Sequence, residues 1–188
     1  EIEERERHGT YILGYTDGTF GPSRSMTRAE AAAIFARLLA DKNGDTISTA
    51  ANTKFTDIPA HAWYSGYVKY LNNNGVTYGK SGNTFAPDDA ITRAEFTTLA
   101  VRFFDVYGDG NKAIMEQYKD FDDVSDGYWA AEYIKAAAKS GWINGYEDGS
   151  FRADHNISRA EVVTIVNRLL GREADEDYIA DNLRKLNT

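Results

Sequence analysis

A five-residue motif occurs three times in this chain. It reads Met-Thr-Arg-Ala-Glu at 26–30, Ile-Thr-Arg-Ala-Glu at 91–95 and Ile-Ser-Arg-Ala-Glu at 157–161. A Thr or Ser followed three residues later by Glu, just ahead of an apolar run, is typical of a capping box at the start of a helix. The second copy follows the first by 65 residues and the third follows the second by 66. This spacing predicts three structural repeats, each with one capped helix.

The similarity between the repeats extends upstream of the motif. Each cap is preceded by a Phe and, further upstream, by a Gly at constant spacing; the residues are Phe20, Phe85 and Phe151, and Gly14, Gly79 and Gly145. The segments that begin at Phe55 and Phe121 also align with each other, so that Trp63 matches Trp129 on the apolar stripe of a predicted helix. A full repeat is therefore predicted to be a helix, a Gly-rich turn or very short hairpin, and a capped helix.

The predicted fold is mainly α, with three helix–loop–helix repeats that pack together. A unit of roughly 60 residues buries too little surface to be stable alone. The predicted limits are 1–45 for a first repeat that lacks its tryptophan helix, 46–110 for the second and 111–171 for the third. Residues 172–188 are expected to form a tail with one short helix, leading into a further segment.

Composition and charge exclude several classes of function. A net charge of −8 argues against general nucleic-acid binding, which needs a basic surface. No apolar run reaches membrane-spanning length. The chain has no cysteine and three isolated histidines, so we predict no metal site. No carboxylate pair, nucleophile elbow or phosphate loop stands out, so we expect neither enzymatic activity nor a cofactor.

The arginine of each motif is not explained by helix formation. It falls on the first helical position, where the helix dipole disfavours a cation by about 0.3–1 kcal/mol. Three such arginines in register, Arg28, Arg93 and Arg159, therefore indicate another role. Each could pair with a carboxylate of a neighbouring repeat, or bind an external anion, and the two roles are compatible.

Together these motifs resemble the surface-layer homology (SLH) family. The pattern of Phe-x-Asp-Val, a tryptophan helix, Gly-Tyr-x-Asp-Gly-x-Phe and the motif above is nearly complete from 121 to 170. The resemblance implies three repeats packed around a pseudo-threefold axis with grooves between them. It also implies an extracellular module of a Gram-positive cell wall or S-layer. Such a module binds, without a covalent bond, an anionic and often pyruvylated secondary cell-wall polysaccharide linked to peptidoglycan.

The resemblance also implies which residues bind the sugar. They are the motif arginines, the groove tryptophans and the loop glycines, here Arg28, Arg93, Arg159, Trp63, Trp129, Gly14, Gly79 and Gly145. An arginine at a helix start adds its guanidinium to free backbone amides, which together suit a carboxylate. On this reading, Arg93→Ala or Arg159→Ala weakens wall binding and leaves thermal stability nearly unchanged.

Other interpretations of these residues stay open. The tryptophans could be core residues, and the glycines could serve turn geometry alone. The first repeat offers no tryptophan, so one groove is expected to be incomplete or to use Tyr11 instead. The second loop has Lys80 where the family has tyrosine, so its groove is expected to depart most from the family pattern. Asp57 and Asp123 are interpreted as caps at helix entry.

Two other functions compete with wall binding. The same grooves could drive contacts with other surface-layer subunits in a lattice. Alternatively, the chain could be a targeting appendage of a surface enzyme.

Overall fold

The computed structural model describes residues 10–108 and 120–172. Within these ranges the chain forms five helices and no strand, as expected for a mainly α fold. The helices are α1 (Arg28–Asn43), α2 (Ser65–Asn73), α3 (Arg93–Tyr107), α4 (Ala131–Lys139) and α5 (Arg159–Leu169). Apart from Arg172, the predicted C-terminal tail lies outside the described residues.

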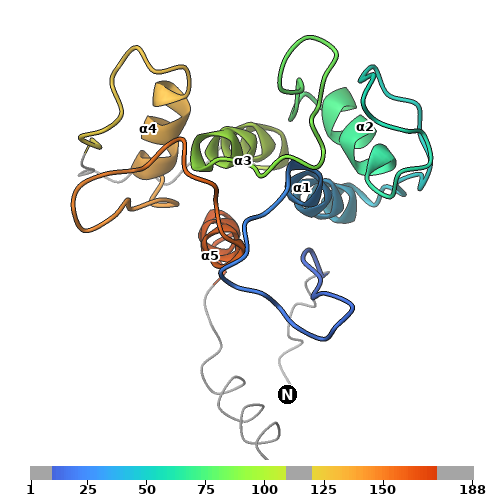
Figure 1. Cartoon of the computed structure of the whole chain (residues 1–188), viewed down its shortest axis with the longest axis horizontal. Helices are drawn as coiled ribbons and strands as arrows, with labels where there is room; N and C mark the ends of the chain where they lie inside the picture. Colours follow the sequence, from blue (N-terminus) through green and yellow to red (C-terminus); the bar gives the residue numbers. More distant parts are fainter. Residues whose placement is uncertain (1–9, 109–119, 173–188) are drawn as a thin grey trace, which may run out of the picture.

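The capped helices α1, α3 and α5 lie at the centre of the molecule, and α2 and α4 lie further out (Figure 1). α2 packs against α1, and α4 packs against α3. Each outer helix thus contacts the capped helix of the preceding repeat. The repeats share one continuous core, in which Phe35 contacts Phe96 and Phe103 with ring centres 5.2 and 4.9 Å apart. Packing across repeats explains how such short units become stable.

Three backbone hydrogen bonds close a ring at the centre of the molecule. The Met26 N–H donates to the Ile157 carbonyl at 3.0 Å, and the Ile157 N–H donates to the Ile91 carbonyl at 3.0 Å. The Ile91 N–H in turn donates to the Met26 carbonyl at 2.9 Å. All three side chains are fully buried. Equivalent positions of the three repeats therefore surround the predicted pseudo-threefold axis.

All three predicted capping boxes are present. The hydroxyls of Thr27, Thr92 and Ser158 accept from the backbone N–H of the glutamate three residues on, and that carboxylate accepts from the cap's own N–H. The first two helical N–H groups also have partners. In α1, the Arg28 and Ala29 N–H groups donate to Asp89 and Pro87 carbonyls of the second repeat.

The same pattern recurs at α3 and α5. Arg93 and Ala94 donate to His155 and Ala153, and Arg159 and Ala160 donate to Arg24 and Pro22. The prediction of free amides at these helix starts was therefore wrong. Every loop that precedes a capped helix also covers the start of another capped helix, which fixes the repeats to one another.

The Gly-rich loops form tight turns and no hairpin strands in the described residues. The N–H groups of Tyr15, Lys80 and Tyr146 donate to the carbonyls of Thr19, Thr84 and Ser150, each at 2.8 Å. Of the short hairpins predicted here, the second loop keeps a single isolated bridge, between Ser81 and Thr84.

Asp57 and Asp123 do not cap helices, so that interpretation was wrong. α2 and α4 begin eight residues later, at Ser65 and Ala131. The Asp57 carboxylate instead accepts from the N–H groups of Phe85 and Ala86, the closest at 2.6 Å. Asp123 accepts in the same way from Phe151 and Arg152, both at 2.7 Å. Ala86 and Arg152 have φ of 57° and 58°, so the aspartates stabilise a backbone turn that is unfavourable for these residues.

Candidate functional site

The three motif arginines form ion pairs across the repeat boundaries. Arg28 pairs with Glu95 at 3.1 Å, Arg93 with Glu161 at 2.6 Å and Arg159 with Glu30 at 3.6 Å. These glutamates are the capping-box residues of α3, α5 and α1. The order runs from first repeat to second, second to third and third to first. The pairs therefore close a second ring around the axis.

Each arginine is also anchored by a carbonyl and an aromatic ring. The Nε atoms of Arg28, Arg93 and Arg159 donate to the carbonyls of Phe85, Phe151 and Phe20 at 2.7, 2.7 and 2.9 Å. The same phenylalanine rings lie within 5.0 Å of the guanidinium carbons. The arginines are only 4%, 6% and 3% exposed. The interpretation as inter-repeat ion pairs is therefore confirmed.

The environment of Glu161 favours its ionised form. Burial alone would raise its pKa, but the Ser158 N–H, the Ser158 and Tyr146 hydroxyls and the Arg93 charge together outweigh burial and lower the pKa. Tyr146 donates to Oε1 at 2.8 Å, the same oxygen that Arg93 contacts. The charge of Arg93 is thus already compensated within the protein.

Three grooves lie beside the capped helices, and each takes its name from that helix. Every groove is lined by the motif arginine of one repeat together with the loop glycine and capping glutamate of the next. The α1 groove contains Arg159, Gly14, Tyr15, Glu30, Arg37 and Trp63. The α3 groove contains Arg28, Gly79, Lys80, Glu95, Arg102 and Trp129. The α5 groove contains Arg93, Gly145, Tyr146, Glu161, Thr164 and Arg168.

The grooves differ in size and in their aromatic walls. Their volumes are about 500 Å³ for the α1 groove, 330 Å³ for the α3 groove and 370 Å³ for the α5 groove. Lys80 does line the α3 groove, but its ammonium group pairs with Asp89 at 2.6 Å. The structure therefore brings the predicted arginines and glycines together in all three grooves.

Trp63 and Trp129 are exposed residues at the groove walls. They are 55% and 58% exposed, so the interpretation as core residues was wrong. Both precede the helices on which their stripe was drawn, because α2 begins at Ser65 and α4 at Ala131. An exposed tryptophan has no stabilising role in the core, and its face remains available for contact.

The α5 groove lacks an equivalent of these tryptophans among the described residues. Trp142 lines it but is 5% exposed and lies 4.7 Å from the ring of Phe104. Tyr11 does not replace the missing ring. Its hydroxyl donates to Asn167 of α5 at 2.9 Å, and its ring is not part of the α5 groove. The incomplete groove expected from the first repeat is thus the α5 groove.

Two of the three loop glycines are required by packing. Gly79 and Gly145 have φ of 91° and 69°. A Cβ at Gly79 would lie 2.5 Å from the Phe55 ring, and one at Gly145 would collide with the Phe121 ring. Gly14 has more room, because the nearest atom to its Cβ position is the Thr19 carbonyl oxygen at 3.2 Å. Turn geometry is therefore part of the role of these glycines.

A second arginine in each groove was not among the residues predicted from the sequence. Arg37, Arg102 and Arg168 stand ten residues after the three caps. The signal was visible in the sequence, because an arginine recurs at the same position in all three capped helices. It was overlooked because arginine on the polar side of an amphipathic helix is common.

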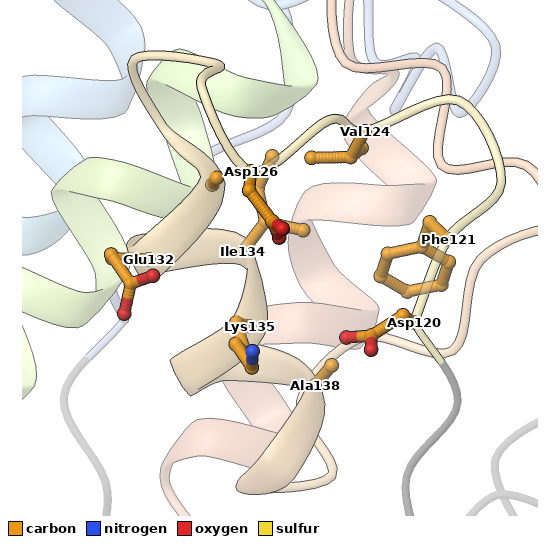
Figure 2. Close-up of a pocket in the computed structure, with 9 residues that line it drawn as sticks. Asp120, Phe121, Val124, Asp126, Glu132, Ile134, Lys135 and Ala138 are labelled. Carbon is orange, nitrogen blue, oxygen red and sulfur yellow. The ribbon is translucent and has the colours of Figure 1, made fainter.

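A separate hollow, between α4 and residues 120–126, is much smaller than the grooves. It has a volume of about 90 Å³ and is lined by Asp120, Asp126, Glu132 and Lys135 (Figure 2). The carboxylates come from separate positions on the rim and do not converge. No cluster of His, Cys, Asp or Glu in 10–108 or 120–172 has the geometry of a metal site. None of the described helices is long and apolar enough to span a bilayer.

These features define a class of protein: a closed ring of three repeats with grooves at the boundaries. The model of the S-layer homology domain matches residues 6–32, 54–97 and 120–163. The chain therefore belongs to the S-layer homology domain family, as its motifs predicted.

Relatives of the chain are proteins of the bacterial surface and enzymes. A cellulosome-anchoring protein of Acetivibrio thermocellus is 38% identical over 168 residues, which are 88% of this chain and 36% of that protein. A surface-layer 125 kDa protein of Lysinibacillus sphaericus is 30% identical over 85% of this chain and 13% of its own length. An exoglucanase, XynX, of Acetivibrio thermocellus is 32% identical over 85% of this chain and 14% of its own length.

The chain thus spans about a third or less of the length of these relatives. The matches confirm the predicted location at the bacterial cell surface and support an anchoring module. Because the part shared with the exoglucanase is a small fraction of that enzyme, the match carries no evidence of catalysis by the repeats.

Proposed function

We propose that this chain anchors a protein to the cell wall, without a covalent bond, by binding an anionic secondary cell-wall polysaccharide in the grooves between its repeats. A pyruvylated glycan fits this role, because its ketal carboxylate is negatively charged and its sugar ring has an apolar face. The observation that carries the proposal is the combination, in the α1 and α3 grooves, of an exposed tryptophan with two arginines.

The net charge of the protein makes this combination notable. A protein of net charge −8 repels anions in general, so an anionic glycan can bind only where cations are gathered locally. Trp63 and Trp129 offer flat faces for sugar rings at the groove walls. Gly14, Gly79 and Gly145 leave the loop backbone uncovered beside the groove.

The motif arginines form the floor of this proposed site. Arg28, Arg93 and Arg159 line the α3, α5 and α1 grooves while they pair with the capping glutamates. N–H groups that their carbonyl and glutamate partners leave unused can donate to ligand oxygens. We therefore keep all eight predicted residues in the proposed site, with the arginines acting in both folding and binding.

Co-sedimentation with wall sacculi tests the proposal. Sacculi of Acetivibrio thermocellus, which encodes a relative of this chain, are prepared with their polysaccharide, and a second batch is treated with mild acid to remove pyruvyl ketals. We expect the chain to sediment with the first batch and to lose most of its binding to the second. Self-association without any wall binding would instead favour a lattice-forming module. Equal binding to both batches would contradict recognition of the ketal.

A further inference from the structure

We infer that the second arginine of each groove, Arg37, Arg102 or Arg168, makes the charge contact with the acidic group of the ligand. The inference rests on the proposed function and assigns the partner of the anion within the same site. It follows from a comparison of the two arginines that line each groove.

The motif arginine has no unbalanced charge to offer. Each one is at least 94% buried and forms an ion pair with a capping glutamate. A second anion placed against such a pair would also meet the glutamate, whose charge repels it. Lys80, the further cation of the α3 groove, is neutralised by Asp89. The ionic contact must therefore come from another group.

The second arginine meets this requirement in all three grooves. Among the described residues, none of the three forms an ion pair with a carboxylate. Arg37 donates to the Tyr67 hydroxyl at 3.4 Å and to the Tyr11 carbonyl at 3.3 Å. Arg168 donates to the Trp142 carbonyl at 3.5 Å. These partners are neutral, so the positive charge remains available to a ligand.

Contacts with two tyrosines orient the guanidinium group of Arg102. Its Nε and Nη2 donate to the Tyr133 hydroxyl at 3.2 and 3.0 Å. The guanidinium carbon lies 4.9 Å from the centre of the Tyr133 ring and 5.0 Å from that of Tyr78. Aromatic contacts fix the plane of an arginine without reducing its charge. Because Nη1 has no hydrogen-bond partner in the described residues, it can donate to a carboxylate oxygen.

The equivalent tyrosine is present in two grooves. Tyr67 on α2 holds Arg37, and Tyr133 on α4 holds Arg102, with the guanidinium 5.0 and 4.9 Å from the ring centres. The tyrosine and the groove tryptophan belong to the same outer segment, four residues apart. A sugar against the tryptophan is therefore flanked by an arginine that the same segment orients.

Binding of variants to untreated sacculi of Acetivibrio thermocellus tests the inference. Arg37→Gln and Arg102→Gln remove one charge each, and a triple variant adds Arg168→Gln. Lys69→Gln on the exposed side of α2 removes the same charge outside the grooves and is the matched control. Arg102→Lys keeps the charge and loses the aromatic fixation.

We expect each single variant to weaken binding by roughly 10- to 100-fold, with unchanged melting temperature, because hydrogen bonds to charged groups are among the stronger ones. The triple variant should lose most binding, since all three grooves lose the charge contact and the avidity between them is lost as well. The residual binding of the triple variant should depend less on salt than wild-type binding does, between about 0.05 and 0.5 M NaCl. Lys69→Gln should bind as the wild type does, and Arg102→Lys should recover part of the loss.

Two results would overturn the inference, and they are distinguishable from failure of the proposed function. If the triple variant binds with wild-type affinity and salt dependence, the proposed function stands and the second arginines have no part in it. The same holds if only a motif-arginine variant with an unchanged melting temperature loses binding. If the wild type does not bind the sacculi, the proposed function fails, and the inference fails with it.

Discussion

Arg93 reaches Glu161 across the boundary between the second and third repeats, with Nη1 2.6 Å from Oε1. The other oxygen of that carboxylate, Oε2, accepts from the Ser158 N–H at 2.8 Å and caps α5. One glutamate thus starts its own helix and holds the preceding repeat. Because the same arrangement recurs at Glu95 and Glu30, the motif joins the repeats as well as shaping the site.

Replacing a motif arginine should therefore destabilise the fold. Arg93→Gln leaves a partly buried carboxylate without its cation, and we expect the free energy of unfolding to fall by about 3 kcal/mol, since Glu161 is still 30% exposed. This replaces the expectation from the sequence that stability would not change. Urea denaturation measures the effect. Arg152→Gln, which breaks an exposed pair with Asp148, is the control and should leave stability nearly unchanged.

Acid should weaken the same contact. Because the folded state lowers the pKa of Glu161, its contribution to stability is fully present above the ordinary value of 4.5 and is lost as pH falls through the lowered pKa. The stability difference between the wild type and Glu161→Gln should therefore shrink as pH falls below about 4.5. Urea titrations of both proteins from neutral pH to about pH 3 measure it. A difference that stays constant over this range would contradict the role given to Glu161.

Tryptophan substitutions should separate binding from folding. Trp63→Ala and Trp129→Ala remove exposed rings, so we expect stability to change by less than about 0.5 kcal/mol while wall binding falls roughly tenfold. Trp142→Ala provides the contrast. That ring is 95% buried, and its loss should cost about 3–5 kcal/mol. Thermal melts measure the effect on stability, and sedimentation with sacculi measures the effect on wall binding. Strong destabilisation by Trp63→Ala would contradict the exposed position described above.

Gly145 should tolerate no side chain. In Gly145→Ala the new methyl group collides with the Phe121 ring, and the backbone keeps a φ of 69°, which is unfavourable for alanine. We therefore expect the free energy of unfolding to fall by about 1–3 kcal/mol. Gly127→Ala is the matched control, because nothing lies within 4 Å of its Cβ position and its φ is not in the left-handed region. Chemical denaturation of both variants measures the difference. Equal stability of the two variants would exclude steric need at Gly145.

Local chemistry made much of this fold predictable. The capping box needs only a hydroxyl and a glutamate three residues apart, so its three copies gave the start of α1, α3 and α5 correctly. The limits of α2 and α4 were harder to predict from the sequence. A stripe of Trp63, Tyr67 and Leu71 fits a helix, yet α2 begins only at Ser65. Periodicity shows which side chains could share a face and leaves open where the first turn forms.

The candidate site was predictable only in part because its contacts cross repeats. The sequence shows that Glu161 can cap α5, and it does not show that one oxygen remains free for Arg93. The amides at the helix starts were assigned to an external anion, although loop carbonyls such as those of Asp89 and Pro87 already occupy them. Such carbonyl partners come from backbone geometry and leave no trace in residue type.

The hydrogen bonds among Met26, Ile157 and Ile91 have a consequence for how such proteins can grow. A solenoid lengthens by adding a unit at either end, since each unit touches only its neighbours. Here the third unit already returns to the first, so no position is left for a fourth. Duplication of this stretch in a gene would yield two separate closed domains joined by a linker, not one longer solenoid.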